Sequence, residues 1–210
     1  MTHGDDERQK DEEHRQKMVE LKAKHDEEVR KRTEKRGLLI VNTGDGKGKS
    51  TASFGLAIRA AGHGKKVAIV QFTKGSWKTG EQAAFRRFPE IEHFVVGDGF
   101  TWDTQNRQAD MASARRGWEI VKELVEKCRG EDPAYDLLVL DELNIVLRYD
   151  YLPTDEIVEY LRHKPEALHI CVTGRDAPAA LVAIADTVTE MKAVKHAYEA
   201  GVKAQKGIEF

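Results

Sequence analysis

The chain of 210 residues is 40% hydrophobic and 33% charged, so it can bury one sizeable core and must also carry a strongly polar segment. Its net charge of −2 gives no sign of a surface for polyanions, and nucleic acid is therefore not expected as a partner. No apolar run approaches the ~20 residues of a membrane span and the polar N-terminus has no apolar secretion signal, so we expect a cytoplasmic protein without a membrane partner.

Residues 1–36 form a charged N-terminal arm. They hold eleven Lys or Arg and eleven Asp or Glu residues, so the segment is neutral. Many acids stand four residues before a base, a spacing that supports a helix by ~0.2–0.5 kcal/mol per pair. These pairs are Asp11–Arg15, Glu13–Lys17, Glu20–Lys24, Asp26–Arg30, Glu27–Lys31 and Glu28–Arg32. The pattern predicts a helical arm outside the core, which either stays solvated or docks over its own or a neighbour's binding site.

The most informative stretch is residues 38–51, LLIVNTGDGKGKST. An apolar run, a glycine-rich turn and a helix-like pattern follow one another, which is the order of a phosphate-binding loop. Glycines let backbone N–H groups face phosphate oxygens, and the start of a helix adds partial positive charge. In this interpretation Lys49 reaches the phosphates and the Ser50 hydroxyl ligates Mg²⁺. The expected nucleotide-binding residues of the loop are Thr43, Gly44, Asp45, Gly46, Lys47, Gly48, Lys49, Ser50 and Thr51.

The loop departs from the usual spacing G-x-x-x-x-G-K-[ST], whose first glycine would stand at Thr43. A glycine at position 44 instead makes the loop one residue tighter, and Lys47 adds a second lysine. The alternative interpretation is a glycine-rich turn that binds nothing. A strand before the loop and a helix after it favour a nucleotide-binding loop of unusual form.

Beyond Gly37, short β-rich runs alternate with helical stretches. After the first strand, further strands are expected at 67–72, 91–96, 137–140, 168–172 and 187–191. Helices are expected after the loop and at 80–88, 107–128, 155–161 and 178–185, with Thr154 as the N-cap of the helix at 155–161. This alternation predicts one α/β domain, residues 37–210, with a mainly parallel sheet flanked by helices on both faces. Cys128 and Cys171 lack metal-like spacing and are expected as reduced thiols in its core.

Two acids, Asp141 and Glu142, follow the apolar run LLVL. Ligands of a parallel sheet sit at the carboxyl ends of its strands, and a carboxylate there can hold Mg²⁺ directly or through water. The alternative is a solvated strand end. Together with Lys49 and Ser50, the acids favour a metal site for Mg²⁺ or Mn²⁺ with Ser50, Glu142 and Asp141 as its residues.

The segment 97–106, GDGFTWDTQN, places Phe100 and Trp102 in a glycine-flanked loop. Either the loop folds back and buries its rings, or it presents an aromatic platform to a flat or bulky ligand. The histidines at 63, 93, 163, 169 and 196 show no spacing typical of metal ligands, so a structural zinc is not expected.

Over residues 37–210 the sequence resembles the ATP:corrinoid adenosyltransferases of the CobA type. The segments that carry the resemblance are TGDGKGKST (43–51), GDGFTWDTQN (97–106), LLVLDELN (137–144), VTGR (172–175), ADTVTEM (185–191) and AGVKAQKGIEF (200–210). Two positions depart from the family's usual pattern, because Asp45 stands where Asn is common and Ser50 where Thr is common. The arm is the part that resembles the family least.

The resemblance implies a RecA-like P-loop NTPase fold and a homodimeric enzyme of adenosylcobalamin biosynthesis or salvage. The Co(I) centre of a corrinoid such as cob(I)alamin would attack C5′ of ATP and expel triphosphate, after reduction by a reduced flavoprotein. Phe100 and Trp102 match the aromatic residues at the lower face of the corrin, where they would exclude an axial ligand and ease reduction of the cobalt. Lys49 and Lys47 would stabilise the leaving triphosphate, and Arg175 would contact phosphate.

Two other functions use the same loop. A P-loop kinase or ATPase of RecA-like type would release ADP, and a nucleotide-dependent switch would bind ATP without turnover. Neither needs GDGFTWDTQN, which is therefore the segment that distinguishes them from an adenosyltransferase. The corrinoid itself is implied by the resemblance alone.

Overall fold

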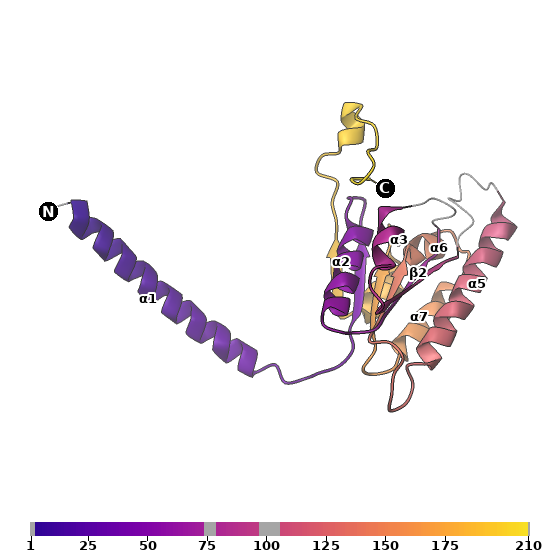
Figure 1. Ribbon diagram of the computed structural model, residues 1–210, viewed down its shortest axis with the longest axis horizontal. Helices are drawn as coiled ribbons and strands as arrows, with labels where there is room; N and C mark the ends of the chain where they lie inside the picture. Colours follow the sequence, from indigo (N-terminus) through magenta and orange to yellow (C-terminus); the bar gives the residue numbers. More distant parts are fainter. Residues whose placement is uncertain (1–2, 74–78, 97–105, 210) are drawn as a thin grey trace. The chain divides into compact units, whose positions relative to one another are not determined.

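The computed structural model describes residues 3–73, 79–96 and 106–209 (Figure 1). The chain divides into two compact units, Met1–Lys35 and Arg36–Phe210. The assignment of ATP and corrinoid binding to residues 37–210, with the arm ending at residue 36, stays a prediction. Within the described residues, no helix combines the length and the apolar character needed to cross a membrane.

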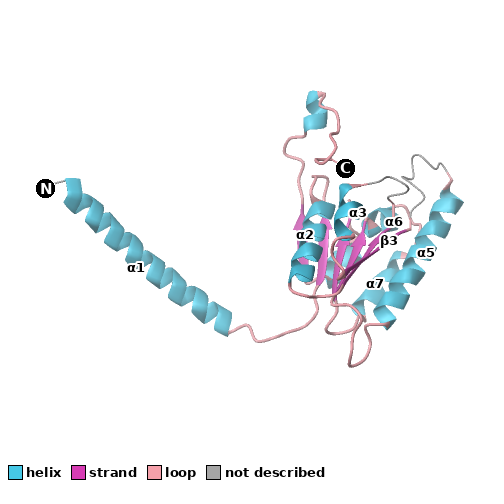
Figure 2. Cartoon of the chain, viewed as in Figure 1, coloured by secondary structure: helices cyan, strands magenta, loops and turns pink. Residues whose placement is uncertain are grey.

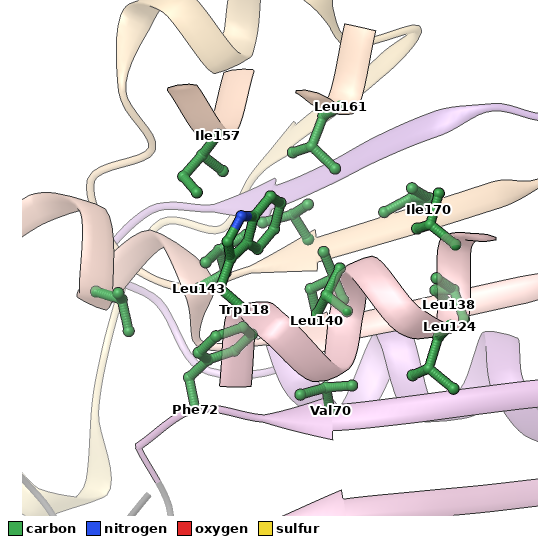
Figure 3. Close-up of a cluster of buried hydrophobic side chains, with 14 of the residues drawn as sticks. Val70, Phe72, Trp118, Leu124, Leu138, Leu140, Leu143, Ile157, Leu161 and Ile170 are labelled. Atoms are coloured by element: carbon green, nitrogen blue, oxygen red, sulfur yellow. The ribbon is translucent and has the colours of Figure 1, made fainter. Parts of the chain in front are cut away.

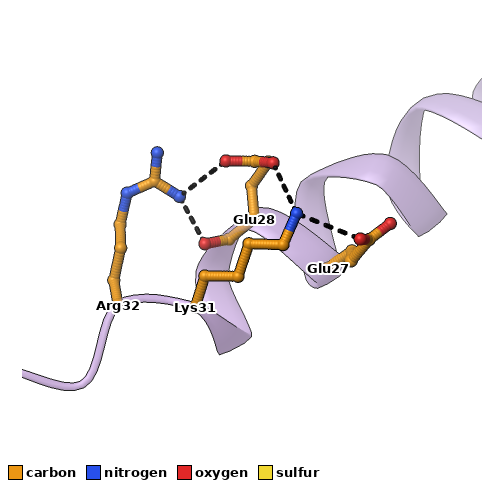
Figure 4. A network of polar contacts seen from close by, with 4 residues as sticks. All are labelled: Glu27, Glu28, Lys31 and Arg32. Carbon is orange, nitrogen blue, oxygen red and sulfur yellow. Dashed lines mark hydrogen bonds and ion pairs between the residues drawn. The ribbon is translucent and has the colours of Figure 1, made fainter.

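The first unit is the helix α1 (His3–Arg30), which confirms the predicted helical arm. Its side chains from Glu7 to Arg30 are exposed. Two of the predicted pairs form at its end, since the Lys31 ammonium lies 3.0 Å from Glu27 and the Arg32 guanidinium lies 3.4 Å from Glu28 (Figure 4). Arg15 instead pairs with Glu12, three residues before it. Pairs as exposed as these contribute little each, so α1 is held by local contacts that are individually weak.

The second unit is built on a six-stranded parallel sheet, which confirms the predicted α/β class. In spatial order its strands are β3 (Ile91–Val95), β2 (Val67–Gln71), β4 (Leu137–Asp141), β5 (His169–Thr173), β1 (Leu39–Thr43) and β6 (Thr187–Glu190). The central strands β2 and β4 are buried along their whole length, because helices cover both faces of the sheet. Strand β5 lies between β1 and β4, and this order decides which loops meet at the carboxyl edge.

Helices connect these strands (Figure 2). They are α2 (Lys49–Gly62), α3 (Gly80–Phe85), α5 (Arg107–Glu126), α6 (Leu143–Arg148), α7 (Thr154–Arg162) and α8 (Ala179–Ile184), and the 3₁₀ helix η1 (Ala197–Ala200) follows the last strand. The short α6 was not predicted from the sequence. The predicted N-cap of α7 was wrong, because Pro153 holds that position and Thr154 is already helical. Asp155 and Glu156 in the first turn supply negative charge that favours the start of α7 in place of a side-chain cap.

Two buried clusters fill the spaces above and below the sheet. On one face Phe54 of α2 packs edge-to-face on Phe85 of α3, with ring centroids 5.2 Å apart. On the other face α5, α6, α7 and α8 cover the larger cluster. Figure 3 shows Trp118 of α5 among residues from strands β2, β4 and β5 and from α7. Cys128 and Cys171 are free and buried, which confirms their predicted place in the core.

The start of β1 is joined to the edge strand β6 through Asp186. Its carboxylate accepts hydrogen bonds from the Arg36 guanidinium at 2.6 Å and from the Leu39 backbone N–H at 2.8 Å. The hydrogen bond from Arg36 is the main reason that the pKa of Asp186 is lowered. Its contribution to stability is therefore complete above the ordinary carboxyl pKa and is lost as the pH falls through the lowered value.

We expect Asp186→Asn to reduce the free energy of unfolding at pH 7 by about 1 kcal/mol, because a charged acceptor of two hydrogen bonds is lost. Urea unfolding followed by circular dichroism measures this difference, and it should narrow as the pH falls below about 4. Asp132→Asn, at an exposed position, is the matched control and should leave stability unchanged. A difference for Asp186→Asn that persists unchanged at low pH would contradict the role of the ionised carboxylate.

Candidate nucleotide-binding site

A pocket of about 560 Å³ opens at the carboxyl edge of the sheet, where four strand ends meet. The loop after β1 provides residues 46–51, and Thr73 follows β2. Glu142 follows β4, while Thr173, Gly174 and Arg175 end β5 and continue beyond it. Ligands of open parallel sheets bind at this edge. The predicted residues that line the pocket are Gly46, Lys47, Gly48, Lys49, Ser50, Thr51, Glu142 and Arg175.

The loop itself is packed against the chain that follows β6. Gly44 has a φ of +93°, and a Cβ atom there would lie 2.4 Å from the Met191 carbonyl oxygen, so only glycine fits without moving backbone. The Gly46 N–H donates to the same carbonyl oxygen at 2.7 Å. That amide is therefore occupied within the protein in this structure, and the neighbouring positions 47–51 face the pocket.

Lys49 is the first residue of α2, and its ammonium bridges the loop. The Nζ atom donates to the carbonyl oxygens of Gly44 at 2.7 Å and Gly46 at 2.6 Å. Burial is the largest effect on its pKa and, with the positive charge of Arg175, lowers it, whereas Asp45 among other acids acts in the opposite direction. A half-buried cation whose charge is disfavoured by its surroundings favours the arrival of an anion.

Three further residues of the loop, Thr43, Asp45 and Lys47, have different surroundings. The Thr43 hydroxyl accepts a hydrogen bond from the Ala177 N–H at 3.0 Å, which joins the loop to the segment before α8. Asp45 is exposed and acts on the site through its charge. Lys47 forms an ion pair with Glu209, so a carboxylate from the end of the chain lies against the loop. Thr43, Gly44 and Asp45 lie outside the pocket lining.

The two acids after β4 have different environments. Asp141 is fully buried, and its two carboxylate oxygens accept hydrogen bonds from Thr173 at 2.8 Å and Gln71 at 2.9 Å. Glu142 lines the pocket and has a left-handed backbone, with φ of +65°. Only Glu142 of the two reaches the pocket surface, and a direct metal bond from Asp141 stays a prediction.

The oxygen atoms around the pocket fit a magnesium ion that arrives with a nucleotide. Glu142 offers a carboxylate, and Ser50 and Thr73 offer hydroxyl groups. The buried Thr73 hydroxyl has no hydrogen-bond partner among the described residues, so an oxygen-rich ligand would satisfy it. Within that part of the chain, no three His, Cys, Asp or Glu side chains gather as an all-protein metal site. Mg²⁺ typically uses one or two protein oxygens together with substrate phosphates, and the residues present fit that use.

Sequence reasoning missed several residues of the pocket. Thr173 and Gly174 stand in the VTGR segment, of which only the arginine was predicted to contact ligand. Glu209 lies in the final segment, where nothing local indicates a contact with the loop. Arg148 and Tyr149 end the unpredicted helix α6 and also line the pocket. The predicted aromatic residues Phe100 and Trp102 lie outside the described residues.

Comparison with known proteins adds the family. The family profile described as ATP:corrinoid adenosyltransferase BtuR/CobO/CobP matches residues 35–210. The chain belongs to this family. A corrinoid adenosyltransferase of Pseudomonas aeruginosa is 49% identical over 96% of this chain and 98% of its own length. One of Escherichia coli K12 is 44% identical over 95% of this chain and 99% of its own length. The members of this family are transferases, so the chain is an enzyme.

The adenosyltransferase relatives also have a counterpart of the arm. The family profile begins at residue 35, and the alignments with the relatives cover 95–96% of this chain. They must therefore include most of residues 1–34, although the sequence pattern made this part the least family-like.

Among solved structures, a KaiC-like protein of Pyrococcus horikoshii is similar with a TM-score of 0.43 and 14% identity, covering 75% of this chain and 72% of that one.

Proposed function

We propose that this protein transfers the 5′-deoxyadenosyl group of ATP to the Co(I) centre of a corrinoid in adenosylcobalamin biosynthesis or salvage. The electron pair of Co(I) forms the cobalt–carbon bond at C5′, and the C5′–O bond breaks with its electron pair leaving on triphosphate. The observation that supports this proposal most is that one pocket of this family member is lined by both Lys49 and Glu142.

The residues of the pocket suit a triphosphate leaving group. Negative charge that builds up on the departing oxygen is stabilised by fixed positive groups that need no rearrangement at the moment of reaction. Lys49 is held by two carbonyl oxygens of the loop, and Arg175 lies on the same pocket. Lys47 joins them when phosphate replaces the Glu209 carboxylate as its partner.

We further propose that Mg²⁺, or Mn²⁺ in its place, binds with ATP at Ser50 and Glu142. When bound, such an ion neutralises phosphate charge and orients the triphosphate. Ser50 is the second residue of α2 and Glu142 precedes α6, so each side chain stands at the start of a helix. Asp141 is buried beneath the pocket and is linked to Glu142 through the Thr173 hydroxyl.

The remaining parts of the proposal are supported by the family resemblance. Phe100 and Trp102 would lie against the lower face of the corrin, and a reduced flavoprotein would supply the electrons for Co(I). The enzyme would act as a homodimer in the cytoplasm.

One anaerobic assay tests the central reaction. Enzyme, ATP, Mg²⁺ and chemically reduced cob(I)alamin are mixed, and the corrinoid absorbance and the phosphate product are both followed. A light-sensitive alkylcobalamin spectrum with an equal amount of triphosphate is the expected result. Release of ADP with an unchanged corrinoid spectrum would identify a kinase or ATPase instead. Binding of ATP without either product would identify a nucleotide-dependent switch.

For Trp102→Ala we expect corrinoid-dependent activity to fall about tenfold or more, because an aromatic contact with the ligand is lost (a tenfold change is about 1.4 kcal/mol). ATP affinity, measured by isothermal titration calorimetry, should stay within about twofold of the unchanged protein. Equal losses of ATP affinity and corrinoid-dependent activity would contradict a separate aromatic platform.

A further inference from the structure

We propose that Thr173 is a positioning residue that holds Glu142 in place, and that the buried Asp141 acts on the site through the Thr173 hydroxyl. The inference rests on the proposed binding of ATP and a divalent cation in this pocket. It assigns a role to a residue that no loop or metal motif of the sequence includes.

The first step is the pair of hydrogen bonds at the Thr173 hydroxyl. Its Oγ1 atom donates to the Asp141 carboxylate at 2.8 Å and accepts from the Glu142 backbone N–H at 2.9 Å. A hydroxyl has one hydrogen to donate, so donation to Asp141 leaves its lone pairs for the Glu142 amide. Thr173 is fully buried, and water therefore does not compete for these positions in the protein.

The second step is the direction of the hydrogen bonds on the far side of Asp141. Gln71 uses its amide nitrogen to donate to Asp141 at 2.9 Å, which leaves its amide oxygen to accept from His93 Nε2 at 2.7 Å. Because an amide oxygen carries no hydrogen, the proton of this contact belongs to the histidine. Gln71 thus holds one oxygen of the Asp141 carboxylate, and the other oxygen accepts the hydrogen bond that orients the Thr173 hydroxyl.

The third step is a set of hydrogen bonds between neighbouring strand ends. The Asn144 side chain donates to the Gly174 carbonyl oxygen at 3.1 Å, and the Gly174 N–H donates to the Asn42 carbonyl oxygen at 3.2 Å. Gly174 has a φ of +130°, and a Cβ atom there would lie 2.8 Å from the Asn144 Cβ. Hydrogen bonds therefore join the turn after β4, the turn after β5 and the end of β1 into one group, which includes Thr173 through its bonds to Asp141 and Glu142.

This group explains how Glu142 keeps its unusual backbone. A glutamate with φ of +65° is in a region that residues other than glycine rarely adopt and that surrounding contacts must enforce. The hydrogen bond from its own N–H to Thr173 is such a contact. Loss of the hydroxyl would release the backbone, and the Glu142 carboxylate would no longer face the Lys49 loop in a fixed position.

The test compares the ATP affinity of purified full-length variants with and without Mg²⁺, by isothermal titration calorimetry. The quantity of interest is the factor by which Mg²⁺ increases affinity. We expect Thr173→Val to reduce that factor about tenfold, a difference of about 1.4 kcal/mol. Thr173→Ser, which keeps the hydroxyl, should restore the factor. Thr173→Cys replaces the hydroxyl by a thiol, a weaker hydrogen-bonding group, and serves if the valine variant does not fold.

A double-mutant cycle shows whether Thr173 acts through Glu142. Thr173→Val combined with Glu142→Gln should have the same Mg²⁺ factor as Glu142→Gln alone. If the reductions of the Mg²⁺ factor in the two single variants multiply in the double variant, the inference is overturned. It is also overturned if Thr173→Val lowers the melting temperature of the protein but leaves the Mg²⁺ factor unchanged. An unchanged ATP affinity of the original protein on adding Mg²⁺ would overturn it too. These readouts measure binding, so they remain valid if the adenosyl-transfer assay fails.

Discussion

Replacement of Lys49 by alanine is expected to lower adenosyl transfer by about 10²–10³-fold, the size of effect typical of a lost group that stabilises charge in the transition state. The loop holds this ammonium with two carbonyl oxygens at 2.6–2.7 Å. Alanine is also the residue most compatible with a helix, so the first turn of α2 should remain. Triphosphate formation from ATP and cob(I)alamin, measured under single-turnover conditions, reports the loss.

Lys127→Ala is the matched control for this prediction. Lys127 is exposed and follows α5, outside the pocket lining, and its removal should change neither rate nor stability. Lys49→Arg keeps the charge but changes its geometry, so a partial activity is expected. If Lys49→Ala turns over as fast as the control, the assignment of Lys49 to the phosphate site is wrong.

The second large effect is expected for Glu142→Gln, on the order of 10²-fold in rate or about 2.7 kcal/mol. Glutamine keeps the length of the side chain and removes the charge. The left-handed backbone of position 142 should cost glutamine the same free energy as glutamate. The Mg²⁺ concentration for half-maximal activity should rise in parallel, because a carboxylate is a preferred oxygen ligand of this ion. A Mg²⁺ titration of the steady-state rate measures both changes.

Glu123→Gln, at an exposed position of α5, is the control for the loss of one negative charge. It should leave the rate and the Mg²⁺ requirement unchanged. If Glu142→Gln needs no more Mg²⁺ than this control, the proposed metal contact of Glu142 is wrong, whatever happens to the rate.

Predictions from the local sequence are most specific where the chemistry of a segment depends on neighbouring residues. Glycines at 44, 46 and 48 followed by Lys49 and Ser50 predict a loop that binds phosphate, because backbone freedom and a helix start are properties of neighbouring residues. Short β-rich runs between helical patterns predicted the parallel α/β class for the same reason. Element ends were less accurate, as with α7, where Pro153 and not Thr154 precedes the helix.

The contacts between strand ends required the tertiary structure. The sequence places Asp141 and Glu142 together, yet one is buried beneath the site and the other lines the pocket. Which of them faces the pocket depends on β5, whose Thr173 binds both, and β5 is next to β4 only in the folded sheet.

The sequence by itself therefore determined the fold class and, through resemblance, the family, and it predicts the phosphate loop, because each of these is indicated by short segments whose pattern is local. The tertiary structure decided how Glu142 is held, that Thr173 and His93 belong to one hydrogen-bonded group, and that Glu209 lies against Lys47. The partners in these contacts are separated by 22 to more than 100 residues in the sequence. Their meeting depends on the order of strands in the sheet, which the chemistry of each segment alone leaves open.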